Sequence, residues 1–256
     1  MIKFTTLLIS CVVFVSSTLC ADSVSRAEAA LQYYREGEVA TNLDQRENAF
    51  NEALAIYGEL AEEFPSGRVN FNLGNCYFQL GEYGWASLYY HRALKSLPRD
   101  EKVKQNLALA QGKLGLEGSS ISSAFESILF FHYRLSSEER WGWFSLFAVM
   151  ASLGFALFVW SKRRLYYLSA TGFSLAAFAM LASLAASQFF GSIYGIMVHP
   201  APLYRDAGTR YALVRQLPLP TGVRVKVLDV TQEGTWLQVT GDGVVGFVEA
   251  DHVRLI

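Results

Sequence analysis

The sequence predicts a multidomain protein with an all-α helical-repeat domain, a transmembrane hairpin of two helices and a small all-β barrel. Three observations predict this arrangement: helical repeats within residues 22–117, two long apolar runs without charge around a basic cluster, and valine alternation with glycine turns towards residue 256. The 256 residues are enough for more than one domain. The formal net charge of −1 argues against a nucleic-acid partner held by bulk electrostatics.

Residues 1–21 are expected to be a secretory signal peptide. Lys3 precedes an apolar core, and cleavage is expected near Cys20 or Ala21. Lipidation of Cys20 is one alternative, and an uncleaved anchor is another that leaves the next domain on the same side of the membrane. Once the leader is removed, Cys76 is the only cysteine in the chain, and core packing is its expected role.

Residues 22–117 are expected to form helical repeats, most clearly at residues 68–98. Two helical periods are separated by a break at residues 80–82, and Pro98 ends the second helix. Small and aromatic residues stand where the tetratricopeptide repeat (TPR), a pattern of about 34 residues, has them. These core-motif residues are Leu73, Gly74, Tyr77, Ala86, Tyr90, Ala93 and Pro98. In this register Gly74 is expected to face Ala86 across the helix pair.

Weaker repeat patterns lie on both sides of this unit. Residues 45–64 resemble the second helix of a degenerate TPR unit, and residues 100–114 resemble the first helix of a third unit that caps the array. The family lines a concave groove with the first helix of each unit, so the resemblance implies a peptide-binding surface there. The polar positions that it implies are Arg68, Asn72, Asn75, Gln79, Lys102 and Asn106.

Two of these positions, Asn72 and Lys102, match part of the clamp by which some TPR domains hold a peptide's terminal carboxylate. Asn106 stands where that clamp prefers arginine, so the match is incomplete. The functional interpretation is that the groove binds a peptide segment of a partner protein. The alternative is a solvated face with no ligand.

Residues 141–190 are expected to span a bilayer twice, as helices 141–161 and 165–190. Both runs lack charged residues and are long enough to cross the hydrocarbon core. Lys162, Arg163 and Arg164 join them, and such clusters stay in the cytoplasm. Both flanking domains are therefore expected in the periplasm of a bacterium, with the spans in its inner membrane.

A linker or juxtamembrane segment is expected at residues 118–140. Residues 124–135 are aromatic, and they either lie in the membrane interface or pack under the repeat domain. Ser136 and Glu139 then match a capping box, which predicts where the first apolar helix opens.

Residues 191–256 are expected to form a small barrel of short strands. Val223, Val225 and Val227 alternate as in a strand, and glycine turns separate the strand patterns that follow. The series at residues 222–223, 234–239 and 246–248 resembles the bacterial SH3 (SH3b) domain. Phe247 stands where tryptophan is common in that family, which leaves the ligand of this domain open.

The order of leader, TPR units, two spans and SH3b-like domain resembles the BatE-type proteins of bacterial aerotolerance operons. The resemblance is carried by residues 72–75, 92–94, 106–110 and 134–136. It implies partners among von Willebrand-type membrane proteins and a MoxR-type ATPase system. It implies little about mechanism, because the molecular activity of the family is poorly defined.

No catalytic, cofactor-binding or metal-binding residue is expected. Cys76 and His91 lie within repeat helices, without the scaffold of a cysteine peptidase, and the sequence has no phosphate loop and no metal-spaced cluster. A scaffold for protein partners is the first hypothesis. A cell-wall sensor that binds peptidoglycan peptides through the SH3b-like domain is the second, and an enzyme subunit that contributes residues in trans is the third.

Overall fold

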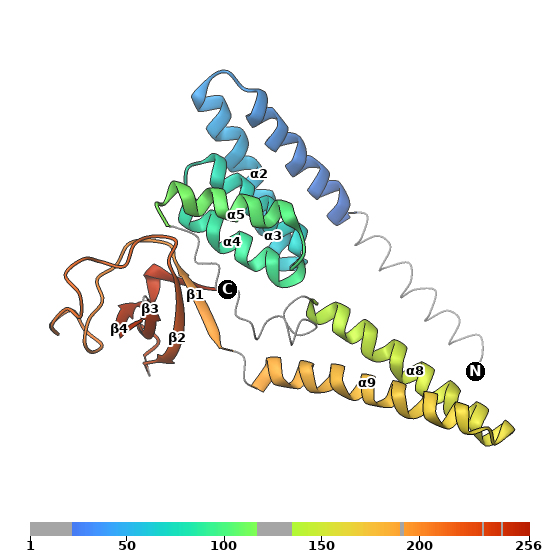
Figure 1. Cartoon of the computed structure of the whole chain (residues 1–256). Coiled ribbons are helices and arrows are strands. Elements are labelled where there is room, and N and C mark those ends of the chain that lie inside the picture. Colours follow the sequence, from blue (N-terminus) through green and yellow to red (C-terminus); the bar gives the residue numbers. More distant parts are fainter. Residues whose placement is uncertain (1–21, 117–134, 190–191, 232, 242) are drawn as a thin grey trace, which may run out of the picture.

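The computed structural model describes residues 22–116, 135–189, 192–231, 233–241 and 243–256 (Figure 1). They form a stack of antiparallel helices, a long hairpin of two apolar helices and a five-stranded antiparallel sheet. The predicted signal peptide and residues 124–134 of the aromatic segment lie outside the described residues.

The helical stack opens with a helix over residues 22–39. It continues with α2 (Leu43–Glu63), α3 (Gly67–Gln79), α4 (Tyr83–Ser96) and α5 (Glu101–Lys113). Side-chain oxygens of Asn42, Ser66 and Asp100 cap the amino-terminal ends of α2, α3 and α5, where main-chain N–H groups have no helical partner. The helices predicted on both sides of residues 68–98, over residues 45–64 and 100–114, are therefore present.

The repeat core is built from the small and aromatic residues of the motif. Leu73, Ala86, Tyr90 and Ala93 are almost fully buried. Gly81 lies in the turn between α3 and α4, where the break was predicted. Its φ is +82°, a conformation that glycine adopts without the steric cost of a Cβ.

The nearest neighbour of Gly74 across the helix pair is Tyr90, rather than the expected Ala86. A Cβ atom built on Gly74 would lie 2.6 Å from the ring of Tyr90, so the glycine makes room for an aromatic ring rather than for a second small residue. A ring at this point fills more of the space between α3 and α4 than a pair of small residues would.

The apolar hairpin consists of α8 (Ser137–Ser161) and α9 (Arg164–Phe189). Ser136 and Glu139 form the predicted capping box, so the last residues of the segment 118–140 belong to α8. Gly154 lies against Ala170, where a Cβ would be only 3.2 Å away, and this close approach lets the two helices pack along their length.

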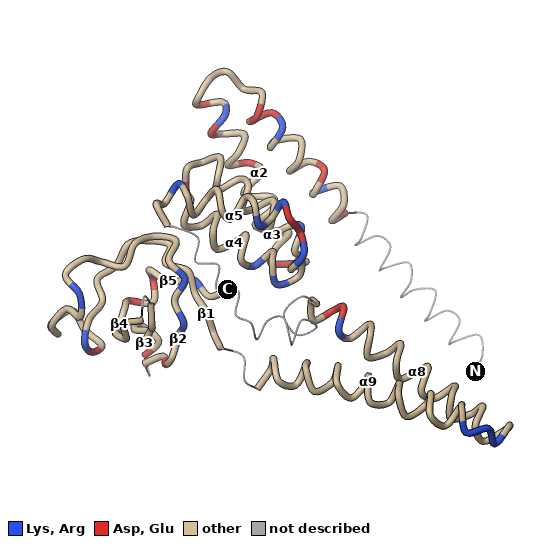
Figure 2. Tube along the Cα trace, viewed as in Figure 1, with Lys and Arg blue, Asp and Glu red and all other residues tan. Residues whose placement is uncertain are grey.

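Both helices of the hairpin are long and apolar enough to cross a membrane. Their large apolar side chains point outwards, as Phe155 and Leu175 show with exposed fractions of 60% and 70%. Figure 2 shows blue residues at the turn of the hairpin, where Lys162, Arg163 and Arg164 lie.

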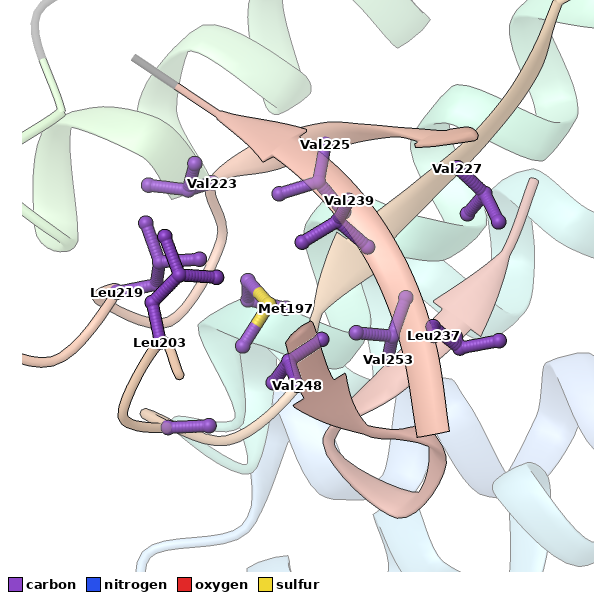
Figure 3. Close-up of a cluster of buried hydrophobic side chains, with 11 residues drawn as sticks. Met197, Leu203, Leu219, Val223, Val225, Val227, Leu237, Val239, Val248 and Val253 are labelled. Carbon is purple, nitrogen blue, oxygen red and sulfur yellow. The ribbon is translucent and has the colours of Figure 1, made fainter. Parts of the chain in front are cut away.

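The sheet contains β1 (Ile193–Met197), β2 (Arg224–Val230), β3 (Trp236–Gly241), β4 (Val244–Glu249) and β5 (Val253–Leu255), in the order β4-β3-β2-β1-β5. Its core is drawn in Figure 3, where Val225, Val239 and Val248 surround Met197. The valine alternation and the glycine turns were predicted, whereas β1 was not.

The helical stack and the sheet meet at α4. Leu88 of α4 is fully buried together with Ile196 and Val198, which come from β1 and the residue after it. An ion pair between Arg99 and Glu139 also joins the end of the α4 region to the first turn of α8. The stack is thus in contact with both the sheet and the base of the hairpin.

Candidate peptide-binding groove

Two of the predicted groove residues lie in direct contact across α3 and α5. Oδ1 of Asn75 accepts hydrogen bonds from the Tyr90 hydroxyl and from Nδ2 of Asn106, each at 2.9 Å. Because one amide oxygen joins three helices, Asn75 fixes the spacing of α3, α4 and α5. Both asparagines are half-buried, which suits a role in holding the groove's shape.

A second polar group connects α3 to the helices that precede it. Nη2 of Arg46 donates to Oε1 of Gln79 at 2.8 Å, and Nε2 of Gln79 lies 3.4 Å from the Tyr34 hydroxyl. The Tyr57 hydroxyl is also hydrogen-bonded to Asn72. Sequence reasoning missed Arg46 and Tyr34, because residues 22–63 match the repeat pattern too weakly to fix their register.

Burial keeps the tyrosines of this network neutral. Desolvation raises the pKa of Tyr57 to about 12, and it raises the pKa of Tyr90 still further above its ordinary value. A neutral phenol can both donate and accept, as the bonds of Tyr90 and Tyr57 require. The network is therefore unchanged over the whole range of physiological pH.

The two cationic residues among the predicted positions are more exposed to solvent than the amide residues. Arg68 at the start of α3 and Lys102 at the start of α5 are exposed. Their side chains are therefore accessible to a ligand, whereas Asn72, Asn75, Gln79 and Asn106 are partly buried. The structure brings Asn75 and Asn106 together and leaves Arg68 and Lys102 as separate cations.

This arrangement is suited to the binding of polar groups. A carbonyl-rich or acidic peptide segment would meet amide donors and two cations, and a charge-assisted hydrogen bond is worth about 1.5–3 kcal/mol. Cys76 of α3 is fully buried in the core, and desolvation raises the pKa of its thiol to about 12. Among the described residues no cluster of three or more His, Cys, Asp or Glu is placed to hold a metal ion.

The comparisons with known proteins identify the class to which this region belongs. The family model of the tetratricopeptide repeat matches residues 67–100, which contain α3, α4 and the loop that follows. The chain is therefore a TPR-containing protein.

Two curated proteins, each named tetratricopeptide repeat protein 16, from Macaca fascicularis and Homo sapiens, are 32% identical to this chain over 71 residues. The match covers 27% of this chain and 8% of each relative, so it concerns a small part of either protein. TPR repeats are interaction modules, and the chain accordingly has the repeat architecture of a protein–protein interaction scaffold.

Proposed function

We propose that the chain is a membrane-anchored periplasmic scaffold that binds a segment of a partner protein in the groove of α3 and α5. The observation that carries this proposal is that α3 and α5, joined by the hydrogen bond between Asn75 and Asn106, each carry an exposed cation, Arg68 and Lys102. The network supplies a rigid polar floor, and the cations supply attraction for acidic groups or carbonyl oxygens. Binding is the role of the groove, and no catalytic step is assigned to it.

The membrane part of the proposal is supported by the hairpin of α8 and α9 and by the contact between α4 and β1. Two adjacent spans place residues before α8 and after α9 on the same side of a bilayer, and the contact of α4 with β1 requires this same arrangement. The basic turn between the spans favours the cytoplasm, which puts the repeat domain and the sheet in the periplasm.

The partners are proposed from the resemblance to BatE-type proteins of aerotolerance operons. Von Willebrand-type membrane proteins and a MoxR-type ATPase system are the candidates. The sheet would then be the SH3b-like domain of such a protein, held beside the repeats.

A cell-wall ligand for the sheet is a second candidate function. Tyr204 and Trp236 form an edge-to-face pair with ring centroids 5.5 Å apart, and Tyr211 is exposed in the same domain. Aromatic side chains that keep a polar tip in solvent suit the binding of peptidoglycan peptides.

Pull-down from detergent-solubilised membranes separates the two functions. The scaffold hypothesis predicts recovery of protein partners that diminishes in Asn72→Ala/Lys102→Ala, in protein shown to be folded. Recovery of sacculus material alone, unchanged in this variant, would contradict the scaffold and favour the sensor. Reporter fusions at Gly118 and Gly208 test the orientation, because a cytoplasmic signal from either would contradict the periplasmic placement.

A further inference from the structure

The outward face of α4 is covered by the sheet through an apolar contact. Leu88, Ile196 and Val198 are buried together, with Trp85, Tyr89 and Ile256 packed around them. Gly84 also lies directly against Thr221, and a Cβ there would be 3.1 Å from the main-chain oxygen of Val198. We call this contact, formed by α4 with β1, β5 and Thr221, the α4–sheet interface.

Polar and aromatic contacts run along the edge of the α4–sheet interface. Arg92 donates to the main-chain oxygen of Leu255 at 2.7 Å, and Lys95 donates to that of Ile256 at 2.8 Å. The rings of Tyr77 and Trp85 are stacked with centroids 5.7 Å apart, and the Arg254 guanidinium of β5 lies 5.7 Å from the Trp85 centroid. These side chains hold the sheet at one position on α4.

His91 lies on α4 between Leu88 and Lys95, among these contacts. Its Nε2 is buried and has no hydrogen-bond partner within the described residues. A neutral imidazole tolerates such a place because an unprotonated nitrogen carries no charge, whereas a protonated ring would bury an N–H without an acceptor.

The charged groups around His91 are mostly cations. Arg224 on β2 is the charged group that acts on His91 from the sheet, and Arg92 and Lys95 lie on its own helix. Arg254 on β5 lies at the interface edge beside Trp85. The further titratable groups at that edge are His199, His252 and Glu249, and Glu249 lies 3.7 Å from Nε2 of His252.

We propose that His91 makes the α4–sheet interface sensitive to acid, so that protonation of its imidazole separates the sheet from the repeat domain. The added charge has no acceptor at Nε2 and is repelled by Arg224. Separation returns the imidazole to water, which is the state that a charged ring prefers. The repeat core is not involved, because it is formed by the opposite side of α4 against α3 and α5.

The direction and size of the effect follow from linkage. Burial, with a contribution from Arg224, lowers the pKa of His91 from 6.5 to about 4. We call the state with the sheet packed on α4 closed and the separated state open. His91 binds a proton less well in the closed state. The stabilisation of the closed state is therefore complete above pH 6.5 and is lost as the pH falls towards 4. Between pH 7.5 and pH 5 the ratio of open to closed molecules should rise about 30-fold.

Spin-label distance measurement on the full chain in lipid nanodiscs tests this proposal. Labels at Glu52→Cys on α2 and Leu228→Cys on β2 report separation, in a chain whose native cysteines are replaced by Cys11→Ser, Cys20→Ser and Cys76→Ala. We expect a longer distance to appear on acidification of this chain and of its His252→Gln variant, and not in its His91→Gln variant.

Two results would overturn the proposal: an unchanged distance distribution in the chain that keeps His91, or equal acid-induced opening in His91→Gln. Circular dichroism over the same pH range gives a third result that would overturn the proposal: a loss of helicity would mean general unfolding rather than separation of the sheet.

A second variant tests the proposal even if His91→Gln does not form the α4–sheet interface. Arg224→Gln keeps the imidazole but removes the neighbouring cation, so the pKa of His91 under the sheet should rise by the part of the shift that is not due to burial. The difference in the pKa of His91 between the closed and open states then becomes smaller. Less opening is therefore expected at pH 5 than in the parent chain. Equal or greater opening in Arg224→Gln would contradict the proposal, and NMR titration of the His91 imidazole measures the pKa directly.

Discussion

The three helices α3, α4 and α5 of the repeat region have two faces that differ in their neighbours. On one face, half-buried amides of Asn75 and Asn106 are hydrogen-bonded, and the cations of Arg68 and Lys102 stand exposed. On the other, Leu88 is fully buried beneath the sheet. The same type of helix pair therefore offers a polar surface to solvent on one side and an apolar surface to its own chain on the other.

This difference shows which face is available to a partner. A ligand for the outward face of α4 must displace the sheet, with loss of the buried area around Leu88 and of the bonds from Arg92 and Lys95. A ligand for the groove needs no such displacement. We therefore expect substitutions on the covered face and among the hydrogen-bonded amides to change stability, and substitutions of the exposed cations Arg68 and Lys102 to change binding.

The largest effect is expected from Leu88→Ala on the covered face. Truncation of a fully buried leucine usually costs about 2–5 kcal/mol through lost burial and the cavity left behind. The sheet should loosen from α4, which the spin-label distance described above reports. Leu109→Ala on α5 is the matched control, because Leu109 is 58% exposed and its truncation should change the free energy of unfolding by less than about 0.5 kcal/mol.

Gly74→Leu tests the packing that lies between the two faces. The new side chain would collide with the Tyr90 ring, and overpacking of this kind costs about 1–3 kcal/mol. The melting temperature of the repeat region should fall. Gly58→Leu on α2 is the control, since a Cβ there meets nothing within 4 Å, and equal melting temperatures for the two variants would contradict the described register.

Asn75→Ala tests the floor of the groove. It removes the acceptor of the hydrogen bonds from Tyr90 and Asn106, for which about 1–3 kcal/mol is expected. Denaturant unfolding measures this loss. Tyr90→Phe/Asn75→Ala should cost less than the sum of the two single variants, and strict additivity would mean that the two side chains do not interact.

The smallest effect on stability is expected from Arg68→Glu/Lys102→Glu. Both side chains are exposed, so the free energy of unfolding should change by less than about 0.5 kcal/mol per site. A larger loss in denaturant unfolding would show that these cations support the fold and would remove the distinction between the two faces.

Local patterns in the sequence predicted much of this architecture. The break before Gly81, the stop at Pro98, the capping box of Ser136 and Glu139 and the alternation in β2 each depend on neighbouring residues, whose spacing the sequence displays directly. The strand β1 was missed because it is a short apolar segment directly after an apolar helix, where periodicity gives no separate signal.

Contacts between distant segments were beyond prediction. Arg92 bonds to a residue 163 positions away, and no local pattern marks that pairing. The ring nearest to Gly74 was not predicted for a related reason, since the repeat pattern specifies small and aromatic positions but not which ring covers which glycine. In the groove, the six polar positions came from the repeat register, whereas Arg46 and Tyr34 needed the structure.

Recovery of partner proteins by charge-reversed chains tests the central claim most directly. Full chains carrying Arg68→Glu/Lys102→Glu are compared with chains carrying Arg205→Glu/Arg210→Glu, which change the same charge at exposed positions of the sheet domain. The account predicts that the first pair loses its partners by about tenfold or more in affinity while the second pair retains them. Equal recovery by both, from protein with unchanged melting temperature, would contradict the assignment of the groove as the partner-binding face.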